Sequence, residues 1–416
     1  MRICMLVYAF YESDTRVLQY AKVLAERGDS VEVFAVRREG TPSFEVMDGV
    51  EVYRIQRRKV NERGRFGYLV RILLFLLRAA FVLTKRQLSK PYDVVHVHSV
   101  PDFLVFAALV PKLLGVRVIL DIHDILPEFY ASKFGISPNS PLFRLLLVVE
   151  KVSTHFADHV IIANHLWHER LVSRSVPREK CTTIINYPDP SIFRPRPIAK
   201  KNRMFRITYP GSMNRHQGLD IAVRAFAKVA DKMPGAEFHI YGDGPAKGSL
   251  IQLTKELGLS ERILFHETLP TPEVAELMAA SDLAVVPKRA SSEFGNEAAS
   301  TKIMEFMSLR IPVIVSRTKI DSYYHNNSTV KFVESENVSD LAEAMLLLWR
   351  DPQLRAQLAV NASEYVLKNN WREKKSDYLR LVDAARVPAA ATQNCQSLCD
   401  CRNPRVPGDG NSIATH

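Results

Sequence analysis

Short apolar runs alternate with amphipathic segments along most of this 416-residue chain. An apolar run at 2–7 precedes a segment at 15–28 whose apolar residues have helical spacing, and the strand pattern VEVFAV follows at 31–36. A strand, a helix and a strand in this order predict a right-handed βαβ unit and a parallel sheet. The turn at 8–16 contains no glycine, which disfavours a dinucleotide-binding oxidoreductase because that site requires G-x-G-x-x-G here.

The alternation continues in two stretches that a linker separates. Strand patterns recur at 93–99 and 117–124, whereas 186–203 is rich in proline and basic residues, a composition typical of linkers. Strand and helix patterns resume behind it, with the same architecture but no repeat of the first half's sequence. We therefore expect an α/β protein with domains at 1–190 and 204–370, joined by a linker at 191–203.

The end of the chain changes from helical periodicity to none. The pattern at 371–387 predicts a terminal helix, and the absence of periodicity from 388 to 416 predicts a disordered tail. The tail cysteines have the spacing C-x3-C-x-C, which lacks a fourth ligand for a structural metal site.

Residues 66–90 form the most hydrophobic stretch of the chain. Arg71 and Arg78 interrupt it and the basic sequence KRQLSK follows, so it is a poor candidate for a transmembrane span. A helix with a wide apolar surface and a basic stripe suits either a core position or contact with an anionic bilayer, and both interpretations remain open.

Composition adds a preference for anionic partners. The formal net charge of +11 is compatible with a nucleotide, a nucleic acid or an acidic membrane surface. Nucleic acid is disfavoured because no recognised binding module or aromatic-interleaved basic stripe is present. Five cysteines do not indicate a disulfide framework, and the start MRICMLVYAF lacks the features of a signal peptide, so we expect a cytoplasmic protein.

Candidate chemistry concentrates in two glutamates of the second domain. Glu297 and Glu305 stand eight positions apart, with Lys302 between them. If Ser300 or Thr301 caps a helix, Glu305 lies in its first turns. Glu297 then lies in the loop above the positive helix end. Such an end can bind a phosphate beside Lys302 while Glu305 binds neutral hydroxyls, although a solvated charged helix start explains the same spacing.

A second candidate group follows the strands of the first domain. His98, His123 and Asp124 stand where predicted strands end, and ligands gather at the carboxyl ends of parallel strands. His96, two positions before His98, is better explained as a buried structural residue. A hydrogen-bonded core position is an equal alternative for His123, and metal binding by the group lacks a close-spaced ligand signature, so we assign no metal site.

Several pieces of the sequence occur in one order that resembles the GT-B-fold retaining glycosyltransferases of family 4. The resemblance spans nearly residues 1 to 387 and is carried by DTRVLQYAKVLAERGDSVEVFAV, DVVHVHS, LDIHDILPE, IINYPD with the following IFRP, YPGSMNRHQGLDIAVRAF, LPTPEVAELMAASDLAVVP and STKIMEFMSLRIPVIVS. It implies two Rossmann-like doubly wound domains that face a cleft, with the nucleotide sugar on the second. It also implies that the helix at 371–387 crosses back to the first domain.

The resemblance also implies roles for matching residues. Glu305 would bind the ribose hydroxyls, and Glu297 would face the donor sugar near its reacting carbon, with Glu293 as a rival at the wrong spacing. His123 matches a cleft histidine that contacts the sugar and helps to orient the acceptor. Gly211 matches the glycine that lets the backbone approach the diphosphate, as a residue without a Cβ permits.

The sequence departs from the family where the diphosphate is expected to bind. Ser212 and Gln217 stand where the family commonly has an arginine and a lysine. We therefore expect other cations, namely Arg215, Lys302 or Lys288, to meet the diphosphate charge.

Cations and N–H groups around a departing diphosphate stabilise the transition state without a metal, so no metal or cofactor is expected. The leaving phosphate could take the acceptor proton while the acceptor attacks the same face, which gives the retention that the resemblance implies. Asp124 and Asp14 are alternative proton acceptors.

The resulting hypothesis is a metal-independent retaining glycosyltransferase. It would move a sugar from a nucleoside diphosphate donor to a hydroxyl acceptor, lipid-linked or part of a growing polysaccharide, in the cytoplasm or on the cytoplasmic face of an anionic membrane. Two alternatives remain open on the same scaffold: a nucleotide-sugar epimerase and a non-catalytic assembly protein.

Overall fold

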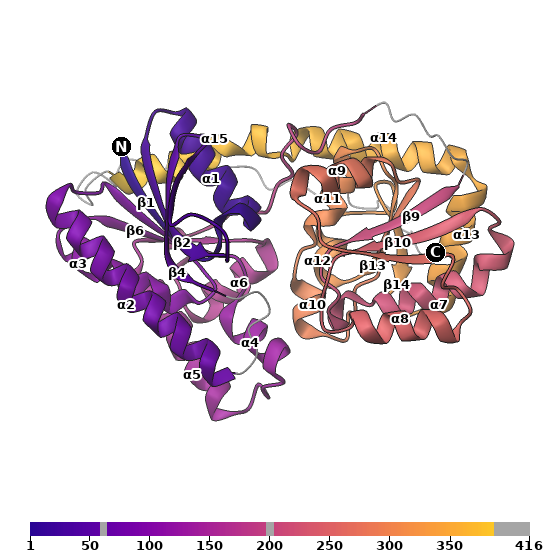
Figure 1. Ribbon diagram of the computed structural model, residues 1–416, viewed down its shortest axis with the longest axis horizontal. Helices are drawn as coiled ribbons and strands as arrows, with labels where there is room; N and C mark the ends of the chain where they lie inside the picture. The colour runs from indigo at the N-terminus through magenta and orange to yellow at the C-terminus, as the bar shows by residue number, and fades with distance from the viewer. Residues whose placement is uncertain (59–64, 197–203, 387–416) are drawn as a thin grey trace, which may run out of the picture.

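Two α/β domains follow one another along the chain in the computed structural model, which describes residues 1–58, 65–196 and 204–386 (Figure 1). The first domain contains an eight-stranded sheet and the second a six-stranded sheet. The predicted linker falls between these sheets. Its second half and the predicted disordered tail lie outside the described residues.

The first sheet is parallel except at one edge. Its strand order is β3-β4-β2-β1-β5-β6-β7-β8, and only the pair β3 and β4 is antiparallel. The strands are β1 (Arg2–Phe10), β2 (Ser30–Arg37), β3 (Phe44–Met47), β4 (Val50–Arg57), β5 (Val94–His98), β6 (Arg117–Ile122), β7 (His159–Ile162) and β8 (Cys181–Thr183). The chain winds outward on both sides of β1, so the topological switch point lies between β1 and β5, where ligands bind in such sheets.

Helices cover both faces of this sheet. They are α1 (Thr15–Glu26), α2 (Arg65–Ser89), α3 (Leu109–Leu113), α4 (Leu126–Phe134), α5 (Pro141–Phe156) and α6 (His165–Arg174), with 3-10 turns η1 (Tyr11–Ser13), η2 (Asp102–Ala108) and η3 (Arg178–Lys180). Polar caps begin three of them: the side chains of Asp14, Ser140 and Asn164 accept hydrogen bonds from backbone N–H groups in the first turns of α1, α5 and α6. The predicted βαβ unit of β1, α1 and β2 is confirmed.

The second sheet is parallel throughout, in the order β11-β10-β9-β12-β13-β14. Its strands are β9 (Phe205–Pro210), β10 (Ala236–Tyr241), β11 (Ile263–His266), β12 (Leu283–Val286), β13 (Val313–Arg317) and β14 (Lys331–Glu334). The helices and 3-10 turns are η4 (Arg215–Gln217), α7 (Leu219–Val229), η5 (Ala230–Lys232), α8 (Lys247–Glu256), α9 (Thr271–Ala279), α10 (Glu293–Glu297), α11 (Thr301–Ser308), α12 (Lys319–Tyr324), α13 (Val338–Arg350) and α14 (Pro352–Lys368). The switch point of this sheet lies between β9 and β12.

The terminal helix α15 (Trp371–Arg386) returns to the first domain, along the top of Figure 1. Tyr378 and Val382 are buried in the hydrophobic cluster that also contains Tyr20 of α1. The rings of Tyr20 and Tyr378 stack with centroids 3.9 Å apart, and the Tyr378 hydroxyl lies 3.1 Å from His96 Nδ1. The predicted GT-B arrangement with a returning helix is confirmed.

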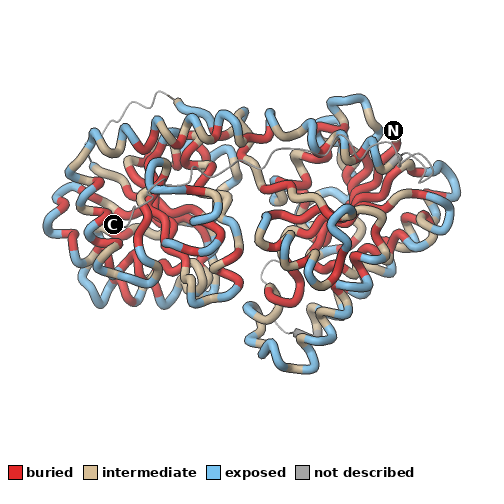
Figure 2. The backbone as a smooth tube through the Cα atoms, turned by 180° about the vertical axis from the view of Figure 1, so that it is seen from behind, coloured by how far each residue is buried: buried red, intermediate tan, exposed pale blue. Residues whose placement is uncertain are grey.

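Helix α2 has one buried and one exposed apolar stripe. Ile72, Phe75 and Leu83 are fully or almost fully buried against the first sheet, as a core helix requires. Leu77 and Phe81, in contrast, are 66% and 70% exposed. By length and composition alone the helix could cross a membrane, a test that core helices of soluble proteins also pass. Figure 2 shows the contrast between buried strands and the more exposed outer helices in both domains.

Candidate functional site

The loop after β9 forms one wall of the candidate site at the switch point of the second sheet. Gly211 has φ of +135°, a conformation that only glycine adopts readily. A Cβ at this position would lie 2.3 Å from Cε and 2.8 Å from Nζ of Lys302. The Lys302 side chain therefore lies directly against the Gly211 backbone, so the structure brings two predicted site residues together.

The N-terminus of α11 forms the second wall. Ser300, one of the two predicted caps, is the N-cap residue, but its side chain makes no capping hydrogen bond, and its buried Oγ has no hydrogen-bond partner among the described residues. Within the described residues, no hydrogen bond or ion pair joins the Lys302 ammonium to another side chain, and burial lowers the pKa of Lys302 although Glu305 opposes this. Uncapped N–H groups, a free hydroxyl and an unpaired ammonium together form an anion site.

Glu305 lies one turn further along α11, as predicted. Its side chain is half-buried, and burial raises its pKa although Lys302 and the Thr301 hydroxyl lower it. In the described part of the chain, this carboxylate makes no ion pair within contact distance. It is therefore available to accept hydrogen bonds from neutral hydroxyl groups.

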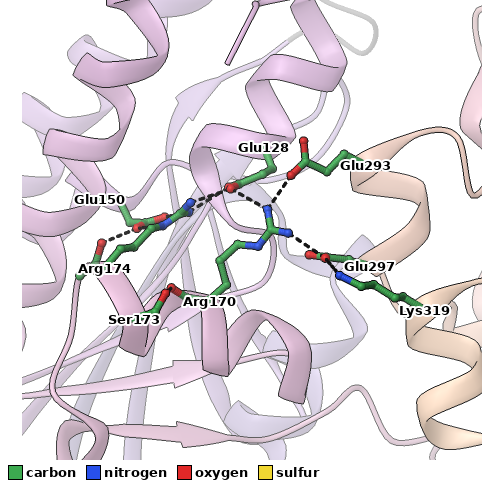
Figure 3. Close-up of polar contacts among 9 residues, drawn as sticks. Glu128, Glu150, Arg170, Ser173, Arg174, Glu293, Glu297 and Lys319 are labelled. Atoms are coloured by element: carbon green, nitrogen blue, oxygen red, sulfur yellow. Dashed lines mark hydrogen bonds and ion pairs between the residues drawn. The ribbon is translucent and has the colours of Figure 1, made fainter. Parts of the chain in front are cut away.

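Glu297 is placed differently from the prediction. It is the last residue of the short helix α10 rather than part of a loop, and it is only 5% exposed. Its Oε1 lies 2.7 Å from Nη2 of Arg170 in the first domain and 3.2 Å from Nζ of Lys319 (Figure 3). Glu293, its predicted rival, also pairs with Arg170, at 2.8 Å, but is exposed. Both glutamates therefore lie at the boundary between the domains.

The other predicted cations differ in their availability. Arg215 is exposed in η4, and its guanidinium has no ion-pair partner in the described ranges. Lys288 is 2% exposed and is held by Asp321 at 2.7 Å and by the Ala298 carbonyl at 2.8 Å, so it has a structural role here. His216, which sequence reasoning missed, lies near Lys302. Burial and the two lysines lower its pKa to about 4, so it is neutral at pH 7.

His123 follows β6 at the switch point of the first sheet. Its side chain is 17% exposed, with Nε2 3.0 Å from Asp121 Oδ2 and Nδ1 3.8 Å from Asp14 Oδ2. Burial lowers the pKa of His123, but Asp121 and Asp14 more than offset this, so the pKa lies above its usual value. No hydrogen bond or ion pair between described residues joins His123 to the second domain.

Asp121 holds this histidine in a buried network. Its carboxylate is fully buried and accepts two hydrogen bonds from Arg16, at 2.8 and 2.7 Å, while Oδ2 lies 3.0 Å from His98 Nδ1. Burial raises the pKa of Asp121, but Arg16 and His123 lower it well below its usual value. Asp124, next to His123, has its pKa raised by burial to about 6.

The network offers a different metal-ligating group from the one considered in the sequence. Potential ligand atoms of His96, His98 and Asp121 lie within 4.8 Å of one another. Both Asp121 oxygens already accept hydrogen bonds from the Arg16 guanidinium, so a cation there would lie beside a fixed positive charge. The cluster fits a hydrogen-bond network better than a metal centre.

Two glycosyltransferase domain models together match most of the described chain. Residues 13–186 match the model described as glycosyl transferase 4-like domain, and residues 192–365 match glycosyl transferases group 1. The chain belongs to this glycosyltransferase family. Sugar transfer is the activity that these two matches support.

Known proteins resemble this glycosyltransferase over nearly its whole length. It is 25% identical over 405 residues to D-inositol 3-phosphate glycosyltransferase of Acidothermus cellulolyticus, covering 92% of this chain and 88% of the relative. Sucrose-phosphate synthase from Thermosynechococcus elongatus has the same fold, with a TM-score of 0.74 and 19% identity over 92% of this chain and 100% of that one. Anabaena Alr3699/HepE in complex with UDP and glucose matches with a TM-score of 0.68 and 19% identity over the same shares.

Three residues of this glycosyltransferase at the domain boundary escaped prediction. Arg170 and Asn164 of α6 and Lys319 of α12 all contact Glu297. No local pattern marks them, because each acts through a contact between segments far apart in sequence. Asp121 had a local signal, since it stands on β6 two positions before His123, which directly follows the strand, and residues two apart in extended chain point to the same side.

Proposed function

We propose that this glycosyltransferase transfers a sugar, with retention of configuration, from a nucleoside diphosphate donor to a hydroxyl acceptor. The observation that best supports the proposal is the Lys302 ammonium. It has no ion-pair partner among the described residues, and it lies beside Gly211 and the uncapped start of α11. An anion site at the carboxyl ends of β9 and β12 is where a doubly wound domain binds a nucleotide. The Anabaena neighbour with UDP and glucose supports a nucleoside diphosphate sugar as the donor class.

The proposed mechanism needs no metal or cofactor. Cleavage of the sugar–phosphate bond places negative charge on the departing diphosphate, which Lys302, Arg215 and the N–H groups of α11 stabilise. Glu305 binds the ribose hydroxyls. The leaving phosphate takes the acceptor proton as the acceptor attacks the same face of the sugar, while Glu297 and His123 bind the sugar.

A donor screen tests the proposal. Nucleoside diphosphate sugars are incubated with a panel of hydroxyl acceptors, and transfer is detected as the mass of a glycosylated product. Lys302→Ala is expected to weaken binding of the free nucleoside diphosphate about tenfold to a hundredfold, the effect of one charge-assisted contact. Lys255→Ala, an exposed lysine of α8, serves as the control. Unchanged binding in Lys302→Ala would refute the assignment of the anion site.

We also propose that the first domain, which would bind the acceptor, works at the cytoplasmic face of an anionic membrane. Helix α2 contains no acidic residue, and its exposed stripe combines Leu77 and Phe81 with the exposed cations Arg78 and Lys85. Apolar side chains beside cations fit the boundary of an anionic bilayer. This supports a lipid-linked acceptor, or a polysaccharide that grows at the membrane.

Flotation with vesicles tests the membrane contact. The enzyme should float with vesicles that contain anionic lipid, and Phe81→Glu should abolish flotation. Leu367→Glu provides a matched control, because Leu367 of α14 is 67% exposed on the second domain. Equal flotation of both variants, or none by the unmodified enzyme, would contradict a membrane role for α2.

A further inference from the structure

Helix α10 belongs to the second domain by sequence but packs into the first domain. Phe294 is 9% exposed and is a member of the hydrophobic cluster that fills one face of the first sheet. Its ring stacks on Trp167 of α6 at 5.8 Å between centroids and meets Phe129 of α4 edge-on at 5.7 Å. The segment that carries Glu297 is therefore anchored in the first domain as well as in its own, where Asn296 Oδ1 accepts the Lys319 backbone N–H at 2.8 Å.

Two side chains of α6 hold Glu297 itself. Arg170 Nη2 donates to the carboxylate at 2.7 Å, and Asn164 Nδ2 donates to the backbone carbonyl at 3.1 Å. Asn164 is fully buried and its Oδ1 also accepts the Trp167 N–H at 2.9 Å, as the N-cap of α6. The backbone and the side chain of Glu297 both have partners in the first domain, and Lys319 of the second domain adds a contact of 3.2 Å to the carboxylate.

Contacts within the first domain orient the Arg170 guanidinium (Figure 3). Its Nη1 donates to Glu128 of α4 at 3.0 Å, and Glu128 is 5% exposed. Arg174, one turn along α6, grips the same carboxylate with contacts of 2.6 and 2.9 Å. Because Arg174 fixes Glu128 and Glu128 fixes Arg170, the guanidinium is pre-organised to receive Glu297.

The rest of the candidate donor site is anchored differently. Ile303 and Phe306 of α11 are fully buried in a cluster of the second domain, so Lys302 and Glu305 move with that domain. Only residues 298–300 separate α10 from α11. A change in the angle between the domains therefore either shifts Glu297 relative to the anion site or breaks its contacts with the first domain.

We propose that Arg170 is a positioning residue that couples domain closure to the placement of the Glu297 carboxylate in the donor site. The inference rests on the proposed function for the role of Glu297, but the docking of α10 stands on geometry alone. With the domains together, as here, Arg170 and Asn164 hold α10 against α6. When the domains part, these contacts break, and of the ion pairs between described residues Glu297 keeps that with the exposed Lys319 of its own domain, while Lys302 and Glu305 keep their positions.

Hydrogen exchange measures the docking without any substrate. In Arg170→Ala, amide exchange over 293–298 should rise at least about tenfold, as expected when one charge-assisted contact between buried groups is lost. Exchange in α11 should stay unchanged. Arg178→Ala serves as the control, because its ion pair with Glu169 is exposed and does not reach the second domain. Unchanged exchange over 293–298 in Arg170→Ala would overturn the inference.

Kinetics then separates positioning from binding. With the donor identified by the screen, Arg170→Ala should lower kcat about tenfold to a hundredfold. The Kd for the free nucleoside diphosphate should remain within about twofold. Arg170→Lys should restore only part of kcat, because an ammonium cannot reproduce the two-nitrogen contact with Glu128 and Glu297.

Each outcome distinguishes the two proposals. If no donor is turned over, the proposed function fails, and the exchange measurement still decides whether Arg170 docks α10. If exchange rises but kcat does not fall, docking is real and the coupling to Glu297 is refuted. Should Arg170→Ala be insoluble, Arg170→Gln, which keeps hydrogen-bonding capacity without charge, is measured in the same two ways.

Discussion

Replacement of Asp121 by asparagine is the sharpest test of the buried network behind His123. The substitution keeps the shape of the side chain and removes one negative charge at a fully buried position. Arg16, 5% exposed, then loses its charged partner, although the Ile184 carbonyl at 2.8 Å and Asn186 Oδ1 at 2.9 Å still accept its other hydrogen bonds. A buried guanidinium without a counter-charge is the main cost.

The expected loss of stability follows from this burial. Removing one partner of a buried ion pair costs about 3–5 kcal/mol. For a domain of this size that corresponds to a fall in Tm of roughly 6–20 °C in the first-domain transition. Asp383→Asn provides the control: its ion pair with Arg27 is 61% exposed on the Asp383 side, so about 0–1 kcal/mol is expected.

The dependence on pH identifies the groups involved. The folded pKa of Asp121 lies well below its usual value, so its contribution is present above about pH 4 and is lost as the pH falls through the folded pKa. The raised pKa of His123 gives a contribution that is complete below about pH 6.5 and is lost as the pH rises through the folded pKa. Calorimetry should therefore show the largest difference in Tm between the unmodified enzyme and Asp121→Asn between about pH 5 and 6.5. A difference in Tm below about 2 °C across that range would refute the reasoning.

Two further predictions concern the second domain. Gly211→Ala should cost about 1–3 kcal/mol of folding stability through backbone strain, and it should weaken nucleoside diphosphate binding by displacing Lys302. Gly258→Ala is the control, because φ is +69° there and no atom lies within 4 Å of the added Cβ. Calorimetry should show unchanged nucleoside diphosphate binding in this control. Glu305→Gln should weaken binding of a nucleoside diphosphate about tenfold and should not change binding of inorganic pyrophosphate, which has no ribose; equal effects on both ligands would contradict the ribose role.

Local chemistry explains what the sequence could predict. Helix α11 could be located because Ser300 precedes an apolar-periodic segment, and this placed Glu305 in its first turns. The parallel sheets followed from alternating strand and helix patterns, which depend on nearest neighbours along the chain. Gly211 was found by resemblance, and the structure supplies its reason in the positive φ and the adjacent Lys302.

Long-range contacts explain what the sequence could not predict. Arg16 and Asp121 are 105 positions apart, and Arg170 and Glu297 are 127 apart, so no spacing rule connects them. The placement of Glu297 in a loop was wrong because Ser292 caps a short helix there, with its side chain accepting the Gly295 N–H at 3.1 Å. Lys288 was a candidate for binding the diphosphate, but Asp321, which stands 33 positions later, pairs with it.

The two glutamates of the candidate site, Glu297 and Glu305, thus differ in the contacts that hold them. Glu305 and Lys302 are held by α11 in the core of the second domain, whereas Glu297 is held by Arg170 of the first domain together with Lys319 of the second. A carboxylate that is fixed by contacts between two domains is fully held only when the domains are together. An anion site within one domain exists whether the domains are together or apart. If the chain binds a nucleotide sugar as proposed, nucleotide binding can therefore precede closure, and the complete set of donor contacts would form afterwards. Under the proposed function, this order would keep the sugar–phosphate bond of the donor away from the full site until the first domain, with His123, has closed over it.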